Sequence, residues 1–365
     1  MSQIEKLDPN FKVPENAGQP DMVFYDCLQP PFSIHGLLLP QQAGEAFLRM
    51  PAAAAAKVSE GVSALNGNTA GGRVRFQTDS PCVAIRAGLH AVGKMPHFAL
   101  TGSAGFDLYY RQPGEEERYG GSFIPPFATE EGYEARVLLP VPRSDRALRE
   151  ITLNFPLYSG VKSLQIGLLP GSALLSAEDY RCPRPAVFYG SSITQGGCAS
   201  RPGNAYPAII SRRLGCDFLN LGFSGNAKGE EEMAEYIASL SMSAFVYDYD
   251  HNAPDVRHLQ NTHERMFLCI RQRQPLLPVV IVSRPQPFLN EEERERLQII
   301  KATYERALAR GDGHVYFVDG SRLLRRFGGD SGTVDRCHPN DLGFLCMAEG
   351  IGEALELALE EAENE

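Results

Sequence analysis

The chain has 365 residues, of which 43% are hydrophobic and 22% charged, as in an ordinary globular protein. Its formal net charge is −10, which excludes a broad basic surface for nucleic acid or anionic lipid, so we expect neither partner. No stretch of about 18 apolar residues occurs, which excludes a membrane-spanning helix.

Length and cysteine usage indicate two domains and reduced thiols. A single core stops growing at roughly 250 to 300 residues, so a chain of this length is expected to divide. Segment 1–11 carries acidic residues early and has no apolar core, so it is not a secretory signal, and we expect a cytoplasmic location. The cysteines form no C-x-x-C pair, and we expect reduced thiols rather than a disulfide framework. They are Cys27, Cys82, Cys182, Cys198, Cys216, Cys269, Cys337 and Cys346.

The first half of the chain has the pattern of β structure. Apolar and polar residues alternate with period two in several short segments, and the joins between them are rich in Gly, Pro, Ser and Asp. The segments are 72–80, 82–87, 106–111, 135–140 and 149–155. A run of alanines at 52–56 indicates one short helical turn. We therefore predict an all-β sandwich or jelly-roll domain over residues 1–180.

The pattern changes near residues 176–185, where prolines interrupt it. Beyond this join, five short apolar runs alternate with segments of helical period, of which 291–310 is the clearest. The apolar runs are 186–189, 217–221, 244–247, 278–282 and 314–318. Buried strands that alternate with helices form a parallel sheet, so residues 184–365 are predicted to be a flavodoxin-like, three-layer α/β/α domain with five strands.

The first of these strands ends in two adjacent hydroxyls. Gly190, Ser191 and Ser192 follow the apolar run, and a second pair of glycines comes at 196–197. This places a hydroxyl on a sharp turn at the carboxyl edge of the sheet, where nucleophiles and phosphate-binding loops are built. Alone, the segment fits a serine nucleophile, a phosphate-binding loop or an ordinary turn.

A base and its partner follow the fifth strand. A serine nucleophile needs a group that accepts its proton and a second group that orients the first. Asp335 and His338 are three residues apart, and Pro339 suits the first turn of the helix that follows. Such a pair alone is more often a helix cap or a surface pair. Its position after the last strand favours catalysis.

Two more strand ends offer donors for an oxyanion. Gly225 follows the second strand, and without a side chain its N–H can approach a substrate closely. Asn252 follows the third strand and offers a side-chain amide. Each alone is more often turn chemistry, but four strand ends with suitable groups favour one site.

In order and spacing these segments resemble the four blocks of the SGNH hydrolases, the superfamily that includes the GDSL esterases and lipases. The resemblance covers about residues 184–360. It implies that Ser192 is the nucleophile, His338 the base and Asp335 its partner. It also implies an oxyanion hole formed by the N–H groups of Ser192 and Gly225 and the side chain of Asn252.

The sequence departs from the family pattern at two places. Ser191 stands where the family has Asp, and Asp250-His251-Asn252-Ala replaces the usual Gly-x-Asn-Asp. Both departures change the wall of the site, so Ser191 and His251 are candidate substrate contacts. A structural hydrogen bond beside Asp250 is the alternative role for His251.

The first half extends the resemblance. The segment from Gly105 to Tyr109, Gly-Phe-Asp-Leu-Tyr, resembles the signature of a small β domain that precedes SGNH domains in one bacterial subgroup. Two-domain carbohydrate esterases have a similar arrangement, which makes a sugar O-acyl ester the leading substrate. Tyr109 and His35 are candidate contributors to the pocket, although a core or loop role is more common for such residues.

We therefore predict a serine esterase that hydrolyses short-chain, notably acetyl, O-esters of carbohydrates through an acyl-enzyme. The same residues would serve an acyltransferase with an alcohol acceptor. Two non-catalytic interpretations remain open, a phosphate or flavin binder and a carbohydrate-binding protein.

The sequence also bears on cofactors, metals and substrate size. We expect no cofactor, because no dinucleotide or P-loop signature follows any strand. We expect no metal at His258 and His263, whose spacing of five is unsuited to one helix face. The absence of Trp favours a small-molecule or oligosaccharide ester over a polymer.

Overall fold

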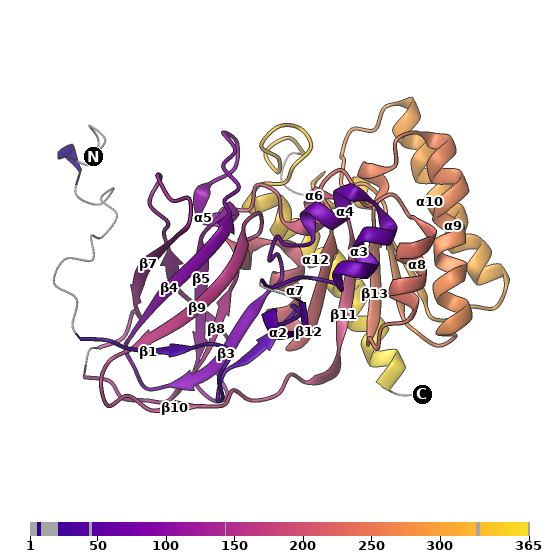
Figure 1. The fold of residues 1–365 in the computed structure, drawn as a ribbon. Helices are drawn as coiled ribbons and strands as arrows, with labels where there is room; N and C mark the ends of the chain where they lie inside the picture. The colour runs from indigo at the N-terminus through magenta and orange to yellow at the C-terminus, as the bar shows by residue number, and fades with distance from the viewer. Residues whose placement is uncertain (1–5, 9–20, 44–45, 143, 326–328, 364–365) are drawn as a thin grey trace.

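The computed structural model describes residues 6–8, 21–43, 46–142, 144–325 and 329–363 (Figure 1). Within these residues, two sheets of antiparallel strands form one part of the molecule, and a parallel sheet with flanking helices forms the other. The predicted flavodoxin-like domain preceded by an all-β sandwich is confirmed. No helix of the described chain is both long and apolar enough to cross a bilayer.

The sandwich consists of a four-stranded and a six-stranded sheet. The first has the order β1 (Val23–Asp26), β9 (Gly160–Leu168), β4 (Cys82–Ala91), β7 (Gly132–Leu138). The second has the order β10 (Leu174–Leu175), β3 (Arg73–Thr78), β8 (Arg149–Asn154), β5 (Phe106–Arg111), β6 (Arg118–Phe123), and β2 (Ser33–His35) pairs with β3. Side chains from both inner faces, such as Phe76, Ile85, Leu108 and Ile166, are fully buried between them. The apolar residues of each alternation thus face this core, whereas the polar residues of β3, β5 and β8 are mostly buried on the other face of their sheet.

The parallel sheet has the strand order β12 (Cys216–Gly222), β11 (Cys182–Gly190), β13 (Ala244–Asp248), β14 (Val279–Val282), β15 (Val315–Val318). Both faces are covered. Phe188 of β11 packs in one core with residues of α7 (Tyr206–Leu214) and α12 (Asp341–Glu363). Val187 and Tyr189 pack in another with residues of α8 (Glu231–Ala238), α9 (Val256–Arg273) and α10 (Glu291–Ala309). This order, with the first strand next to the centre, is that of flavodoxin-like sheets.

Shorter helices connect these elements. They are α2 (Pro40–Ala43), α3 (Ala52–Val58), α4 (Glu60–Leu65), α5 (Leu100–Ser103), α6 (Ser192–Gln195), α11 (Gly320–Leu323), and the 3₁₀ helices η2 (Pro202–Asn204) and η3 (Asp250–Asn252). The expected helical turn at 52–56 is the start of α3, and the helix expected at 291–310 is α10. A capping box formed by Asn290 and Glu293 stabilises the first turn of α10.

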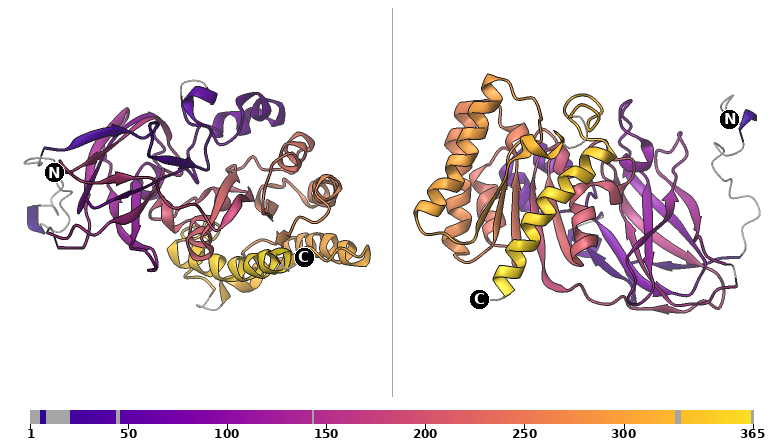
Figure 2. Two further views of the ribbon diagram at one scale, coloured as in Figure 1. Left: turned by 90° about the horizontal axis from the view of Figure 1, so that it is seen from below. Right: turned by 180° about the vertical axis from the view of Figure 1, so that it is seen from behind.

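Helices α3 and α4 leave the sandwich and cover the parallel sheet. Ala55 of α3 and Val62 of α4 are fully buried in the same core as Met233 of α8. Figure 2 shows them on the side of the sheet opposite to α12. The predicted domain ranges, 1–180 and 184–365, stay a prediction. Helices α3 and α4 fall within the first range but contribute side chains to the core of the second part.

Cys182 and Cys216 form a disulfide, which corrects the expectation of reduced thiols for this pair. They stand opposite each other at the first residues of β11 and β12, and their Cα atoms are 5.1 Å apart, within the range that a disulfide spans. The pair lies 34 residues apart in sequence, so only strand pairing reveals it. The other cysteines form no disulfide within the described residues.

Candidate active site

The turn after β11 presents Ser192 at the carboxyl edge of the sheet. Ser191 is fully buried and caps α6, because its Oγ accepts a hydrogen bond from the Ile193 N–H at 3.1 Å. Ser192 is the first residue of α6, so its own N–H is among the donors that a helix leaves unpaired. Gly190 is required here, since a Cβ would lie 2.1 Å from both the Asp248 carbonyl oxygen and Thr194 Oγ1.

The predicted base and its partner reach this hydroxyl. Ser192 Oγ lies 2.9 Å from Nε2 of His338, and Nδ1 of His338 lies 2.8 Å from Oδ2 of Asp335. Burial raises the pKa of Asp335, but hydrogen bonds from the His338 side chain and backbone outweigh it and lower the pKa to about 2. Asp335 is therefore a carboxylate at neutral pH and fixes the His338 ring through its Nδ1 proton.

The loop that carries this pair is a tight turn. Thr333 and Pro339 form an isolated antiparallel bridge, and the Val334 N–H donates to the His338 carbonyl at 2.8 Å. Oδ1 of Asp335 accepts from the N–H of His338 at 2.7 Å, and Arg336 closes the turn with a φ of 71°. The loop thus determines the position of His338 before the long helix α12 begins.

The predicted oxyanion donors lie on two neighbouring loops. Gly225 has a φ of 68°, and open space surrounds the position of a Cβ there. Asn252 ends η3, and its Nδ2 donates to the Phe223 carbonyl at 2.8 Å, which ties the loop after β13 to the loop after β12. The side-chain amide of Asn252 carries two hydrogens, so the one that is not bonded to the Phe223 carbonyl can donate to a substrate. The roles of Gly225 and Asn252 stay predictions.

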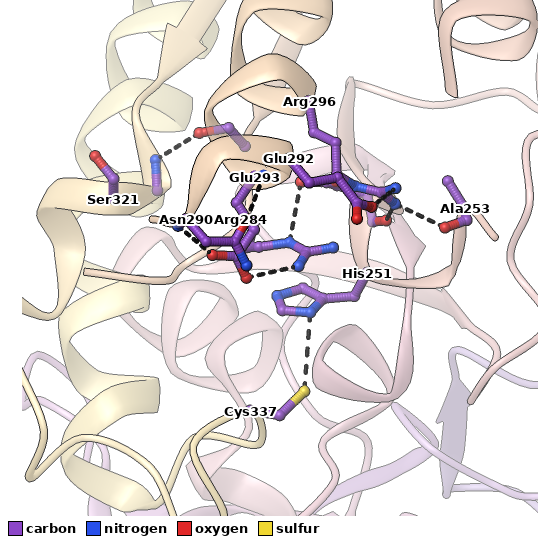
Figure 3. A network of polar contacts seen from close by, with 12 residues as sticks. His251, Ala253, Arg284, Asn290, Glu292, Glu293, Arg296, Ser321 and Cys337 are labelled. Atoms are coloured by element: carbon purple, nitrogen blue, oxygen red, sulfur yellow. Dashed lines mark hydrogen bonds and ion pairs between the residues drawn. The ribbon is translucent and has the colours of Figure 1, made fainter. Parts of the chain in front are cut away.

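Buried ion pairs hold η3 in place (Figure 3). Arg296 of α10 donates to Oδ1 of Asp250 at 2.8 Å and to the carbonyls of Asp250 and Ala253 at 2.8 and 2.7 Å. Arg284 lies 3.3 Å from Oδ2 of Asp250 and 3.0 Å from Glu293. Because the charges are paired and the Asp250 and Ala253 carbonyls accept hydrogen bonds from Arg296, the ion-pair network supports η3 and Asn252 rigidly.

His251, beside Asp250, contacts the loop that carries His338. Its Nδ1 lies 3.8 Å from Sγ of Cys337, the residue before His338, as Figure 3 shows. Burial and the nearby Arg284 guanidinium lower the pKa of His251 to about 3, so the ring is neutral at pH 7 and can accept from the thiol. Its Nε2 is buried without a hydrogen-bond partner among the described residues. A substrate contact at His251 stays a prediction.

The candidates from the sandwich lie away from the triad. The Tyr109 hydroxyl accepts from Arg201 at 3.3 Å, and Tyr109 lines a cavity of about 990 Å³ between the two parts, which no triad residue lines. His35 pairs with Asp217 at 3.0 Å, near the amino end of β12 and thus at the opposite edge of the sheet from Ser192. A substrate contact at Tyr109 stays a prediction, as it does at Ser191, whose side chain is enclosed.

Three residues beside the triad escaped sequence analysis. Tyr158, which follows β8, donates its hydroxyl hydrogen to the Ser192 carbonyl at 3.2 Å. The ring centre of His97, in the loop before α5, lies 6.0 Å from that of His338. Cys198 is buried just after α6 and has a φ of 74°. The sandwich therefore contributes to the surroundings of Ser192, which no local pattern in the sequence indicates.

Comparison with known proteins agrees with this class of fold. Residues 183–356 match the GDSL-like lipase/acylhydrolase family, and residues 22–174 match the GxDLY family, the N-terminus of SGNH-hydrolase-type esterases. No curated protein matches the chain significantly. The two family matches together place the molecule in the two-domain SGNH esterase class.

Solved structures with both parts are similar over nearly the whole chain. A GDSL-like lipase from Bacteroides ovatus has 29% identity and a TM-score of 0.82, with 93% of this chain and 98% of that chain covered. A salicylyl-acyltransferase from a tetracycline biosynthetic pathway has 20% identity and a TM-score of 0.73, with 92% and 97% covered. A family two carbohydrate esterase from Clostridium thermocellum has 13% identity and a TM-score of 0.62, with 91% and 99% covered. The chain belongs to the GDSL-like lipase/acylhydrolase family through its second domain and to the GxDLY family through its first.

Proposed function

We propose that the protein is a serine esterase that hydrolyses short-chain O-acyl esters, notably acetyl esters, of carbohydrates. The observation that carries the proposal is the continuous hydrogen-bonded series from Ser192 through His338 to Asp335, with distances of 2.9 and 2.8 Å. A hydroxyl, an imidazole and a carboxylate in this order form a general-base system for attack on a carbonyl.

We propose the following steps for the reaction. Ser192 Oγ attacks the ester carbonyl while His338 Nε2 takes its proton, and the Asp335 carboxylate stabilises the imidazolium. The N–H groups of Ser192 and Gly225 and the Asn252 amide bind the oxyanion. His338 then gives the proton to the leaving sugar hydroxyl, and a water activated by the same imidazole releases the acid from the acyl-enzyme.

Family membership and architecture support the choice of substrate. The family is one of acylhydrolases, and the neighbours that share both parts of the fold include the carbohydrate esterase from Clostridium thermocellum. A family two carbohydrate esterase from that organism was solved in complex with cellohexaose, which favours an oligosaccharide or small-molecule ester here.

The test compares two serine variants. Ser192→Ala is expected to lower kcat on nitrophenyl acetate by on the order of 10⁴-fold, with an unchanged melting temperature. Ser239→Ala, an exposed serine that follows α8, makes the same chemical change far from the site and is expected to keep full activity. Retained activity in Ser192→Ala would remove this residue from the role of nucleophile. Acetylated mono- and oligosaccharides, with the loss of acetyl read by mass spectrometry, then identify the sugar.

Acyl transfer to an alcohol is the second candidate. The salicylyl-acyltransferase has both parts of this fold, and transfer requires the same triad with water excluded from the acyl-enzyme. Product analysis with and without candidate acceptor alcohols separates the two reactions, because a transferase makes a new ester only when the acceptor is present.

A further inference from the structure

Three metal-ligand side chains converge beside Ser192. One donor atom each from His97, Cys198 and His338 lies within 4.8 Å of the other two. The three come from separate segments: the loop before α5 of the sandwich, the turn after α6, and the loop before α12. His97 is exposed, Cys198 is buried and His338 is half-buried, so the cluster opens to solvent on the side of the sandwich.

The geometry of His338 suits a metal ligand. Its Nδ1 is bound to the Asp335 carboxylate at 2.8 Å, so Nε2, which lies 2.9 Å from Ser192 Oγ, is the nitrogen that can bind a metal in place of the serine hydroxyl. A carboxylate that holds the far nitrogen of an imidazole is the usual support of a histidine that binds zinc, because it fixes the ring and strengthens the donor. The arrangement that prepares His338 as a base therefore also prepares it as a ligand.

The position of Cys198 is fixed by its turn. Its φ of 74° is unusual for a residue with a side chain. Two backbone hydrogen bonds hold the turn on either side of Cys198. The Gly197 N–H donates to the Ser192 carbonyl at 2.8 Å, and the Ala199 N–H donates to the Gly196 carbonyl at 3.1 Å. Nothing in the reaction proposed above uses a thiol at this point.

Two imidazoles and a thiolate are a ligand set for Zn²⁺. Bond lengths of about 2.0 Å to nitrogen and 2.3 Å to sulfur put tetrahedral donors roughly 3.3 to 3.8 Å apart. The separations here need to shorten by about 1.5 Å at most to reach that geometry, and the exposed His97 side chain has room to move. Softer sulfur and nitrogen donors select zinc over magnesium or calcium.

We propose that His97, Cys198 and His338 form a binding site for Zn²⁺ that switches off the hydrolase. On binding, the Cys198 thiol releases its proton to solvent, and the metal takes the lone pair of His338 Nε2. That lone pair is the one that accepts the Ser192 proton in catalysis, so zinc and substrate turnover exclude each other. The inhibitory effect rests on the proposed function, whereas the binding site does not.

The experiment measures binding and activity separately on the full-length protein. After treatment with a chelator and its removal, Zn²⁺ is titrated by calorimetry, and Co²⁺ is added as a spectroscopic probe. We expect one Zn²⁺ per chain, and a thiolate-to-cobalt charge-transfer band in the near ultraviolet. His97→Ala and Cys198→Ser are each expected to weaken Zn²⁺ binding at least about 10-fold, and Cys198→Ser to abolish the band. Cys269→Ser, a half-exposed cysteine on α9, is the matched control with wild-type binding.

The outcomes separate the two proposals. Zn²⁺ is expected to inhibit nitrophenyl acetate hydrolysis in the wild type and in Cys269→Ser, and at least about 10-fold less effectively in His97→Ala. Ser192→Ala is expected to bind Zn²⁺ although it is inactive, so loss of activity in that variant leaves the metal site intact. Wild-type affinity in both His97→Ala and Cys198→Ser would overturn the site, and full activity of the zinc-loaded protein would overturn the inhibition. His97 is exposed, so its variant folds even where Cys198→Ser does not.

Discussion

Asp248 lies directly behind the nucleophile turn and is fully buried at the end of β13. Its Oδ2 accepts hydrogen bonds from the hydroxyls of Thr194 and Tyr206, both at 3.3 Å, and its Oδ1 has no partner among the described residues. Burial raises the pKa of Asp248 to about 8, although the two hydroxyls lower it. The carboxyl is therefore mostly neutral at pH 7, which explains how an acid is tolerated between the sheet and α7.

This pKa predicts how stability changes with pH. In the unfolded chain Asp248 ionises near the ordinary value of 3.8, so between about pH 4 and 8 the unfolded state binds fewer protons than the folded state. The stability that Asp248 contributes is complete below about pH 4 and is lost as the pH rises through about 8. Asp248→Asn removes this dependence because an amide does not ionise.

Urea denaturation at about pH 5 and about pH 9 tests the predicted effect of Asp248 on stability. We expect the free energy of unfolding of the wild type to fall by at least about 1 kcal/mol more than that of Asp248→Asn between the two conditions. Asp330→Asn, at an exposed aspartate, is expected to follow the wild type. Parallel curves for the wild type and Asp248→Asn would show that this carboxyl does not titrate in the range.

The residues of the site differ in how far the sequence predicts them. Ser192 follows the end of β11 and His338 precedes α12, each in a short motif, so the topology of a parallel sheet indicates that both lie at its carboxyl edge. Their roles as nucleophile and base stay predictions. Tyr158 and His97 lie in loops of the sandwich, and they reach the site only because the two parts dock. No periodicity or local motif records that contact.

At the scale of elements, the close approach of β12 to α6 places Ser192. Gly222 ends β12, and a Cβ there would lie 2.2 Å from the Gln195 N and 2.8 Å from its Cα. Asn220 on the same strand donates its Nδ2 to the Thr194 carbonyl at 2.8 Å. The strand therefore contacts the backbone of α6 directly, and no flexible side chain is present to absorb added volume.

Gly222→Ala is expected to lower the free energy of unfolding by about 1 to 3 kcal/mol, because backbone must move to admit the methyl group. It is also expected to lower kcat, since α6 carries Ser192. Gly313→Ala is the control, because Gly313 is exposed with nothing within 4 Å of the added carbon. Urea denaturation and esterase kinetics on both variants provide the test. Equal free energies of unfolding for the two variants would mean that β12 and α6 can separate to admit the methyl group without a cost in stability.

The elements themselves follow the sequence where the strand is buried along most of its length. The five apolar runs became the strands of the parallel sheet, and the strands predicted at 72–80 and 106–111 are β3 and β5. β6 contains Gly120 and Gly121 and is mostly half-exposed, and β9 has two exposed residues inside a buried run. Neither shows a regular alternation, because their burial depends on neighbouring strands and on bulges.

At the scale of the whole molecule, a buried carboxylate of the sandwich contacts the part that contains the parallel sheet. Asp107 of β5, within the Gly-Phe-Asp-Leu-Tyr segment, is fully buried and accepts from the Gly203 N–H at 2.8 Å and from Asn154 Nδ2 at 2.7 Å. Arg201 lies 3.6 Å from the same carboxylate. The signature thus binds η2, the segment that follows the nucleophile turn. The sequence suggests the domain type from this motif, but the contact joins residues 96 positions apart and is visible only in three dimensions.

Asp107→Ala tests whether this carboxylate holds the two parts together. The substitution leaves the buried Gly203 N–H and the Asn154 amide without an acceptor, which is expected to lower the free energy of unfolding by about 1 to 3 kcal/mol. Because η2 follows the turn of Ser192, we also expect a lower kcat and faster proteolytic cleavage between residues 176 and 185. Asp21→Ala, at an exposed aspartate of the same part, is the control with wild-type melting and kinetics. If Asp107→Ala melts and cleaves like this control, other contacts between the parts, such as the His35–Asp217 pair and the packing of α3 and α4 against α8, hold the sandwich in place, and the buried carboxylate is a local feature of β5.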